Sequence, residues 1–344
     1  LRCGSREEGR ARGQDHQGLE KQQFEIEKFY KGRGILICET TQGLFALKEF
    51  HGQMSKAEYL YQMGQFLKDR NISCDYMMKN QDGILLTEGV DGVRYSFHRW
   101  VKGRECDTRS RLDIVMTVSF LAKFHEAGSG TGIFFPDTKQ GNLEKAAPGT
   151  ESLYEECLRH DRELRRIRKY VLLRKNKSDF ERLFLKCFPE YIRQSEEVLR
   201  FLADCQNLLP GHTVGLCHGD FNQHNVVIES GGMTLIHMEH ARYGAQMTDL
   251  GNFLRKMLEK HEWSETLGLE MLREYSRIHP IGEADWTELY CRLCYPEKFW
   301  KIANHYFRSN KVLDSGKNYE KLKKENRQNF MRRKFLETLK RAKL

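Results

Sequence analysis

The pattern of apolar and polar residues changes along this chain, from short alternating runs to a helical period. Up to residue 101, the apolar runs are short, rich in β-branched and aromatic residues, and separated by turn residues, which predicts strands. The predicted strands span residues 22–30, 34–40, 44–50, 83–87 and 94–101. One helix begins at Ser55, and Glu58 three residues later suggests a capping box. This region is predicted to be a small β-rich unit with one helix.

From residue 107 onward, the apolar residues recur at the spacing of amphipathic helices. The predicted helices span residues 112–127, 152–175, 178–207, 248–259, 264–277, 285–294 and 297–309, with a last one from 319. Ser178 and Glu181 form a capping box at the start of the third helix. We therefore predict an α+β, bilobed protein-kinase-like fold. Its N-lobe is β-rich (residues 21–101) and its C-lobe is mostly helical (residues 102–344).

The segment from His218 to Asn225, HGDFNQHN, has the H-x-D-x-x-x-x-N spacing of kinase catalytic loops. In such a loop an Asp meets the acceptor hydroxyl, and an Asn five residues later turns back toward a Mg²⁺ on the ATP phosphates. Asp220 is therefore the candidate catalytic base and Asn225 a candidate metal ligand. His218 is expected to anchor the loop rather than to take part in the chemistry.

Lys48 lies on a predicted strand, in Ala-Leu-Lys-Glu. In kinases a strand lysine contacts the α and β phosphates and is held by a glutamate of the following helix. Glu58 is the best partner by position, so both residues are candidates for nucleotide binding. The alternative for Lys48 is an exposed lysine on an edge strand.

Two further segments are placed where a nucleotide would bind. Gly32 and Gly34 lie between the first two strands, where a phosphate-covering loop belongs, although a β-turn explains a lone G-x-G equally well. Trp100 and Val101 end the last N-lobe strand, at the expected hinge between lobes. There the backbone would hydrogen-bond adenine.

The second metal position departs from the kinase pattern. After the apolar segment 233–236, an Asp is expected to bridge Mg²⁺ and the phosphates, but the chain has His237 there, followed by Glu239. Mg²⁺ prefers oxygen donors to imidazole. Glu239 replaces the missing carboxylate if the backbone shifts by two positions, and His237 would favour Mn²⁺. Asp249 begins a helix and is expected to brace the catalytic loop.

Composition adds a basic C-terminal segment. The 344 residues include 57 Lys/Arg and 48 Asp/Glu, a net charge of +9; residues 298–344 hold 15 of the basic and 4 of the acidic residues, so this segment carries +11. Such a segment attracts acidic polymers or proteins, or else it is an amphipathic helix packed through Phe330, Phe335, Leu336 and Leu339. Residues 1–20 are predicted to be disordered, no membrane span is expected, and the ten scattered cysteines predict reduced thiols in the cytoplasm.

Residues 22–339 together resemble the aminoglycoside/choline-kinase-like phosphotransferase superfamily, and most of all the CotS family of spore-coat kinase-like proteins. The segments that carry the resemblance are 30–34, 47–48, 218–225, 249–256, 296–304, 309–311 and 316–317. The resemblance implies a bilobed kinase-like fold. It also implies production in the cytoplasm of the mother cell of a spore-former and association with the spore coat.

These observations predict an ATP- and Mg²⁺-dependent phosphotransferase that transfers the γ-phosphate to an unknown hydroxyl acceptor. The alternative is a catalytically impaired pseudokinase that serves as a structural component of the spore coat, a reading that His237 motivates. Aminoglycoside resistance is less favoured, because polycationic drugs need an acidic acceptor pocket and the C-lobe ends in a basic segment. Nucleic-acid binding by that segment is likewise the weaker interpretation.

Overall fold

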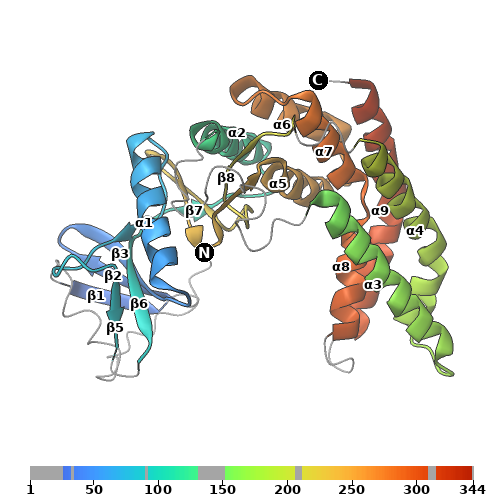
Figure 1. Cartoon of the computed structure of the whole chain (residues 1–344), viewed down its shortest axis with the longest axis horizontal. Coiled ribbons are helices and arrows are strands. Elements are labelled where there is room, and N and C mark those ends of the chain that lie inside the picture. The colour runs from blue at the N-terminus through green and yellow to red at the C-terminus, as the bar shows by residue number, and fades with distance from the viewer. Residues whose placement is uncertain are drawn as a thin grey trace. The chain divides into compact units, whose positions relative to one another are not determined.

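The computed structural model describes residues 26–31, 35–89, 92–130, 152–205, 211–308 and 315–342 (Figure 1). The predicted disordered segment 1–20 and the two glycines Gly32 and Gly34 lie outside the described residues. The chain divides into two compact units. The first comprises Leu1–Asn142 and Gly215–Tyr243, and the second comprises Leu143–Val214 and Gly244–Leu344.

The first unit is built on an antiparallel sheet with strand order β1-β2-β3-β6-β4, in which β5 also pairs with β6. The strands are β1 (Ile26–Lys31), β2 (Ile35–Thr40), β3 (Gly43–Glu49), β4 (Met77–Met78), β5 (Leu86–Glu88) and β6 (Arg94–Arg99). Cys38, Phe45, Leu47 and Phe97 form a buried apolar cluster on this sheet. The cluster includes Phe45 and Leu47 of β3, a strand predicted from its short apolar run between turn residues.

Two helices and a second sheet complete the first unit. Helix α1 (Met54–Asp69) follows β3, and α2 (Arg111–Gly128) begins at the Ser110 N-cap. The second sheet has the order β10-β9-β7, from β7 (Arg104–Glu105), β9 (Val226–Glu229) and β10 (Gly232–Leu235). A two-stranded sheet pairs β8 (Val214–Cys217) with β11 (Arg242–Ala245). Because β7 pairs with β9, the catalytic-loop hairpin belongs to the same compact unit as the N-terminal sheet. The compact units therefore do not coincide with the predicted lobe boundary at residue 101.

The second unit is helical. Its helices are α3 (Leu153–Leu173), α4 (Asp179–Asp204), α5 (Met247–Lys260), α6 (Glu265–Ile278), α7 (Glu283–Cys294), α8 (Glu297–Arg308) and α9 (Ser315–Ala342). One of its core clusters joins α3, α4, α8 and α9. Phe299 stacks on both Tyr191 and Phe184, with ring centroids 4.2 Å and 5.3 Å apart. The antiparallel sheet followed by helices confirms the predicted α+β kinase-like class.

The predicted capping box of α4 is present. Ser178 Oγ accepts from the Glu181 amide at 3.2 Å, and Glu181 Oε2 accepts from the Ser178 amide at 2.9 Å. Ser178 Oγ also lies 2.9 Å from Tyr306 Oη. We expect Ser178→Ala to lower the free energy of unfolding by about 1–2 kcal/mol in urea titrations, because the cap and this extra contact are both lost. The exposed box of α3 is the control: Ser152→Ala should cost less, and equal losses would contradict a role for Tyr306.

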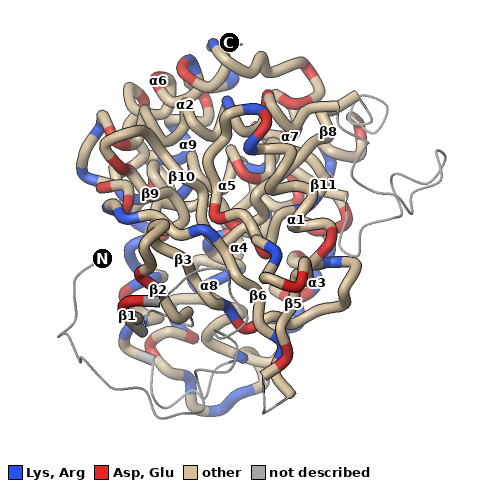
Figure 2. The backbone as a smooth tube through the Cα atoms, turned by 90° about the vertical axis from the view of Figure 1, so that its left-hand side faces the viewer, with Lys and Arg blue, Asp and Glu red and all other residues tan. Residues whose placement is uncertain are grey.

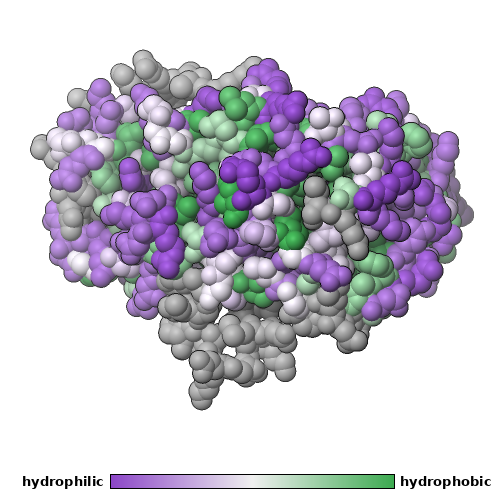
Figure 3. All heavy atoms as spheres, turned by 90° about the horizontal axis from the view of Figure 1, so that it is seen from above, coloured by the Kyte–Doolittle hydropathy of each residue, from purple (hydrophilic) through white to green (hydrophobic). Residues whose placement is uncertain are grey.

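The surface is mostly polar. Hydrophilic residues cover most of the face shown in Figure 3, with small groups of hydrophobic residues between them. Among the described residues, no helix combines the length and the apolar composition that a membrane crossing requires. Lys/Arg and Asp/Glu positions are interspersed along the backbone (Figure 2).

The basic C-terminal segment contains most of α8 and all of α9. Phe335, Leu336 and Leu339 are buried, as expected for a packed amphipathic helix, whereas Phe330 is 73% exposed, which contradicts its expected packing. Basic side chains of α9 pair with acidic residues of the same unit: Arg333 with Glu190 and Lys334 with Glu265, both at 3.0 Å. Part of the charge is thus neutralised within the unit.

Candidate active site

Lys48 is a buried cation in the first unit. Its residue is 6% exposed, and its Nζ lies 2.6 Å from Asp75 Oδ2 and 3.3 Å from Glu239 Oε2. The alternative of an exposed edge-strand lysine is wrong, because β3 is paired on both sides, with β2 and β6. A buried ammonium needs a carboxylate partner, and two carboxylates supply it here.

The expected pairing of Lys48 with Glu58 is wrong. Glu58 is exposed on α1, and no ion pair involves it among the described residues. The buried side of α1 instead consists of residues such as Ala57, Leu60 and Met63. The predicted capping box is absent too, because α1 begins at Met54 and its N-cap residue makes no side-chain hydrogen bond.

Asp75 is the residue that sequence reasoning missed. It is 2% exposed, and besides Lys48 its Oδ2 accepts a hydrogen bond from the His237 amide at 2.8 Å. The Met238 amide points to its Oδ1 at 3.4 Å. One carboxylate therefore ties the strand lysine to the segment that carries His237 and Glu239. The only signal in the sequence is an acidic residue flanked by Cys74 and by the apolar pair 77–78.

The ion cluster shifts the pKa values of its members. Burial alone would lower the pKa of Lys48, but Asp75 and Glu239 raise it above its usual value. Burial alone would raise the pKa of Glu239, but the His237 hydrogen bond (Nδ1 to Oε1, 2.9 Å) and the charge of Lys48 hold it well below its usual range. Lys48 and Glu239 are therefore both charged at neutral pH.

His98 lies beside this cluster and makes the stability of the first unit pH-dependent. Its Nδ1 donates to the Asp75 carbonyl at 2.9 Å, and its Nε2 lies 2.9 Å from Ser96 Oγ. Burial, together with the charge of Lys48, lowers the pKa of His98 from 6.5 to about 4. The folded state therefore binds fewer protons than the unfolded state between these values, and stability falls as pH drops from 6.5 to 4.

We expect this effect to amount to about 3 kcal/mol across that pH range. The measurement is the free energy of unfolding of wild type and His98→Gln from pH 7 to pH 4.5. The variant should lose less stability on acidification, whereas the exposed-residue control His51→Gln should follow wild type. Parallel curves for wild type and His98→Gln would exclude the explanation.

The catalytic-loop candidate is anchored by His218 and Gly219. His218 is fully buried; its Nε2 donates to the Ile236 carbonyl at 3.0 Å, and its Nδ1 accepts from the Asp220 amide at 3.3 Å. Gly219 has φ +83°, and a Cβ there would lie 2.2 Å from the His240 carbonyl oxygen. Only glycine fits this conformation and this close approach. The Ile236 amide also donates to the Asn225 carbonyl at 3.0 Å, which joins the loop to the strand before His237.

Asp220 and Asn225 lie in contact. Asn225 Nδ2 donates to the Asp220 carbonyl at 2.8 Å and to its Oδ2 at 3.2 Å. Both of these bonds use the amide nitrogen of Asn225, so its Oδ1 oxygen can still bind a metal ion. The carboxylate of Asp220 is exposed, where an acceptor hydroxyl would reach it. Asn222 is buried and bonds to the backbone of residues 220 and 224, so it shapes the turn.

The oxygen donors available for a metal are few. Asn225 offers one amide oxygen and Glu239 a carboxylate that already binds Lys48 and His237. No group of three or more His, Cys, Asp or Glu residues within the described ranges is arranged to hold a metal ion. Mg²⁺ in phosphotransferases commonly takes one or two protein oxygens, with phosphates and water as its other ligands. The donor set fits a nucleotide-bound Mg²⁺ and not a metal held by protein alone.

The remaining candidates are placed as follows. The Trp100 ring lies near the cluster: its centroid is 6.0 Å from Lys48 Nζ and 6.4 Å from the His237 ring. The Trp100 amide donates to the Leu44 carbonyl at 2.9 Å, so it is not available to adenine. Val101 is half-buried. Asp249 is buried in the first turn of α5, in the second unit.

Comparison with known proteins identifies relatives that match most of the chain. The chain is 24% identical over 297 residues to spore coat protein S of Bacillus subtilis (strain 168), covering 84% of this chain and 81% of that protein. In structure it resembles an aminoglycoside phosphotransferase from Alicyclobacillus acidocaldarius, with a TM-score of 0.82 and 20% identity over 99% of both chains.

A spectinomycin phosphotransferase in complex with ADP and spectinomycin matches with a TM-score of 0.59 and 11% identity over 88% of this chain and 90% of that chain. The fold is thus that of the aminoglycoside phosphotransferases, as the sequence predicted. The family model described as "Spore coat putative kinase YutH" matches residues 19–339. The chain therefore belongs to the YutH/CotS-like family of spore-coat kinase-like proteins.

Proposed function

We propose that this protein is an ATP-dependent phosphotransferase that transfers the γ-phosphate to a hydroxyl acceptor. The observation that carries the proposal is the contact between the exposed Asp220 carboxylate and Asn225, whose amide oxygen is left for a metal. Asp220 accepts the proton of the acceptor hydroxyl, and Lys48, held by Asp75, binds the phosphates. A bound Mg²⁺ would neutralise charge on the phosphates, with Asn225 and Glu239 as its protein ligands. Mn²⁺ is the alternative ion, because His237 stands beside Glu239.

The second candidate is a pseudokinase that serves as a building block of the coat. It is favoured by the hydrogen bond between His237 and Glu239, since the carboxylate that would replace the missing Asp is already engaged. In either case we propose that the protein is made in the cytoplasm of the mother cell and joins the spore coat, as the name of the Bacillus relative suggests. Exposed basic residues of α9 would bind acidic coat polymers or proteins.

The test is thermal stability with ATP and either Mg²⁺ or Mn²⁺, for wild type and Asn225→Ala. A ligand at about 100 times its Kd adds about 2.7 kcal/mol, which corresponds to a rise of roughly 5–11 °C in Tm for a unit of this size. We expect a metal-dependent rise in wild type that is lost in Asn225→Ala. Asn80→Ala is the control for the loss of a buried Asn elsewhere in the first unit. If neither metal produces a rise in folded wild type, the pseudokinase becomes the better interpretation.

A further inference from the structure

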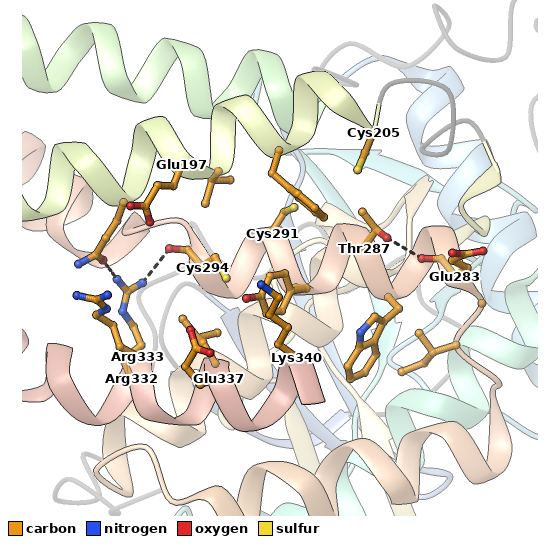
Figure 4. Close-up of a pocket in the computed structure, with 18 residues that line it drawn as sticks. Glu197, Cys205, Glu283, Thr287, Cys291, Cys294, Arg332, Arg333, Glu337 and Lys340 are labelled. Carbon is orange, nitrogen blue, oxygen red and sulfur yellow. Dashed lines mark hydrogen bonds between the residues drawn. The ribbon is translucent and has the colours of Figure 1, made fainter. Parts of the chain in front are cut away.

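The second unit contains a groove that the proposed phosphotransferase site does not use. It has a volume of about 910 Å³ and lies between α4, α7 and α9 (Figure 4). Its walls include Val198, Phe201, Trp286, Tyr290 and Leu336, which are apolar or aromatic. None of the catalytic-loop residues lines it. Along α7 it extends from Glu283 to Cys294, about 16 Å at 1.5 Å per residue.

One end of this groove holds Arg332, which is 3% exposed. Its Nη1 donates to the carbonyls of residues 293, 294 and 295 at 3.2–3.4 Å, and its Nη2 donates to Gln194 Oε1 and Asn329 Oδ1. All these acceptors are neutral. Its Nε–H has no hydrogen-bond partner in the described structure, although a guanidinium has five donors to satisfy.

Arg332 also lacks a counter-charge. No ion pair joins it to a carboxylate in the part of the chain that the structure describes. The carboxylate of Glu325, on the same helix, attracts Arg332 electrostatically without a direct ion pair. Burial raises the pKa of Glu325, which favours the neutral form of that carboxyl group. Buried charges in proteins are normally paired. Arg332 is therefore a buried cation without a full partner, at the wall of a cavity large enough for a ligand.

The other charges of the groove lie at its exposed rim. These charges are two cations, Arg333 and Lys340, and three carboxylates, Glu197, Glu283 and Glu337. Figure 4 draws all five among the residues that line the groove, together with the thiols of Cys291 and Cys294. The rim charges nearly balance, and solvent screens them. Burial raises the pKa of Cys294 to about 11, so its thiol is neutral at pH 7. The charge at the buried end of the groove is thus that of Arg332.

We propose that this groove binds an organic carboxylate with an elongated apolar body. The carboxylate lies against the Arg332 side chain and supplies its missing negative charge, and a small shift of that side chain brings the buried, unbonded Nε–H to the carboxylate. The apolar body lies along α7, against Tyr290 and Leu336, and reaches toward Trp286. A charge-assisted hydrogen bond to a carboxylate is about twice as strong as a neutral one, so the head group determines specificity and the walls contribute apolar burial.

The test is calorimetric titration of the full chain with decanoate, far below its micelle concentration. Decyltrimethylammonium, which has the same chain length and the opposite charge, is the comparison ligand. We expect decanoate to bind with one-to-one stoichiometry and the cation to bind at least tenfold more weakly. Equal binding of both, or several molecules per chain, would show surfactant adsorption and overturn the proposal.

Variants separate the head group from the walls. Arg332→Met should weaken decanoate binding at least tenfold, whereas Arg193→Met, a half-exposed arginine of α4 outside the groove, should leave it unchanged. Arg332→Met also removes bonds to the end of α7 and could unfold the unit, so Leu336→Trp, which fills the groove and keeps Arg332, provides a second test. Thermal melting checks that each variant is folded. Decanoate binding at wild-type strength in a folded Leu336→Trp variant would contradict the assignment, whatever the phosphotransferase measurements show.

Discussion

Asp75→Asn should lower the free energy of unfolding of the first unit by about 3–5 kcal/mol and abolish ATP binding. The carboxylate of Asp75 holds Lys48 at 2.6 Å and accepts the His237 amide at 2.8 Å, all in a buried setting. Removal of one partner of a buried ion pair leaves an uncompensated charge, which costs this much. The amide that replaces it would also direct N–H donors at Lys48 or at His237. Urea unfolding with a probe of the first unit measures the loss.

Glu239→Gln is the matched control. Its carboxylate also contacts Lys48, but at 3.3 Å and with a side chain 36% exposed, so the loss should be about 1 kcal/mol or less. Lys48→Met combined with Asp75→Asn should recover part of the stability, because the buried charge is removed together with its partner. A single Asp75→Asn variant within 1 kcal/mol of wild type would show that the ion pair does not support the fold.

Local signals explain which parts of the fold were predictable. The capping box at Ser178 joins neighbours three residues apart, and the helical period of α4 and α6 repeats within a few turns. The conformation from His218 to Asn225 is likewise set within one loop, where the Asn225 side chain bonds to the backbone of the loop and the His218 side chain bonds to the backbone next to the adjacent strand. Sequence spacing is sufficient for such features, because the partners are separated by few residues.

The partner of Lys48 was not predictable in this way. Asp75 lies 27 residues after Lys48 in the sequence, and Glu239 lies 191 residues after Lys48. The choice between Glu58 and Asp75 depends on which face of α1 is buried, and Glu58 lies on the exposed face. Strands β4 and β7 have two residues each, too few for an alternating pattern to be visible. Contacts between distant segments therefore set the electrostatics of the site.

Asp220→Asn should reduce ATP turnover by a factor of about 10²–10⁴, the usual contribution of a positioned general base. The variant keeps the carbonyl that accepts the Asn225 amide at 2.8 Å, so the loop and the metal ligand should stay in place. The temperature rise with ATP and Mg²⁺ should therefore match wild type. Phosphate release with water as the acceptor measures turnover without knowledge of the natural substrate. Asp82→Asn, the same chemical change at an exposed turn, is the control.

His237→Asp is the opposite change at the same site and completes this prediction. An Asp there restores an oxygen donor beside Asn225, and Asp tolerates the left-handed conformation at this position, where φ is +64°. If wild type turns over ATP and Asp220→Asn does not, Asp220 is the base, and His237→Asp should shift the preferred ion toward Mg²⁺. The other outcome is that wild type does not hydrolyse ATP, that His237→Asp creates turnover, and that adding Asp220→Asn removes it again. The site then keeps its catalytic base but lacks a metal ligand, and the chain acts in the coat as a pseudokinase. Turnover in wild type that survives Asp220→Asn unchanged would contradict both accounts of the loop.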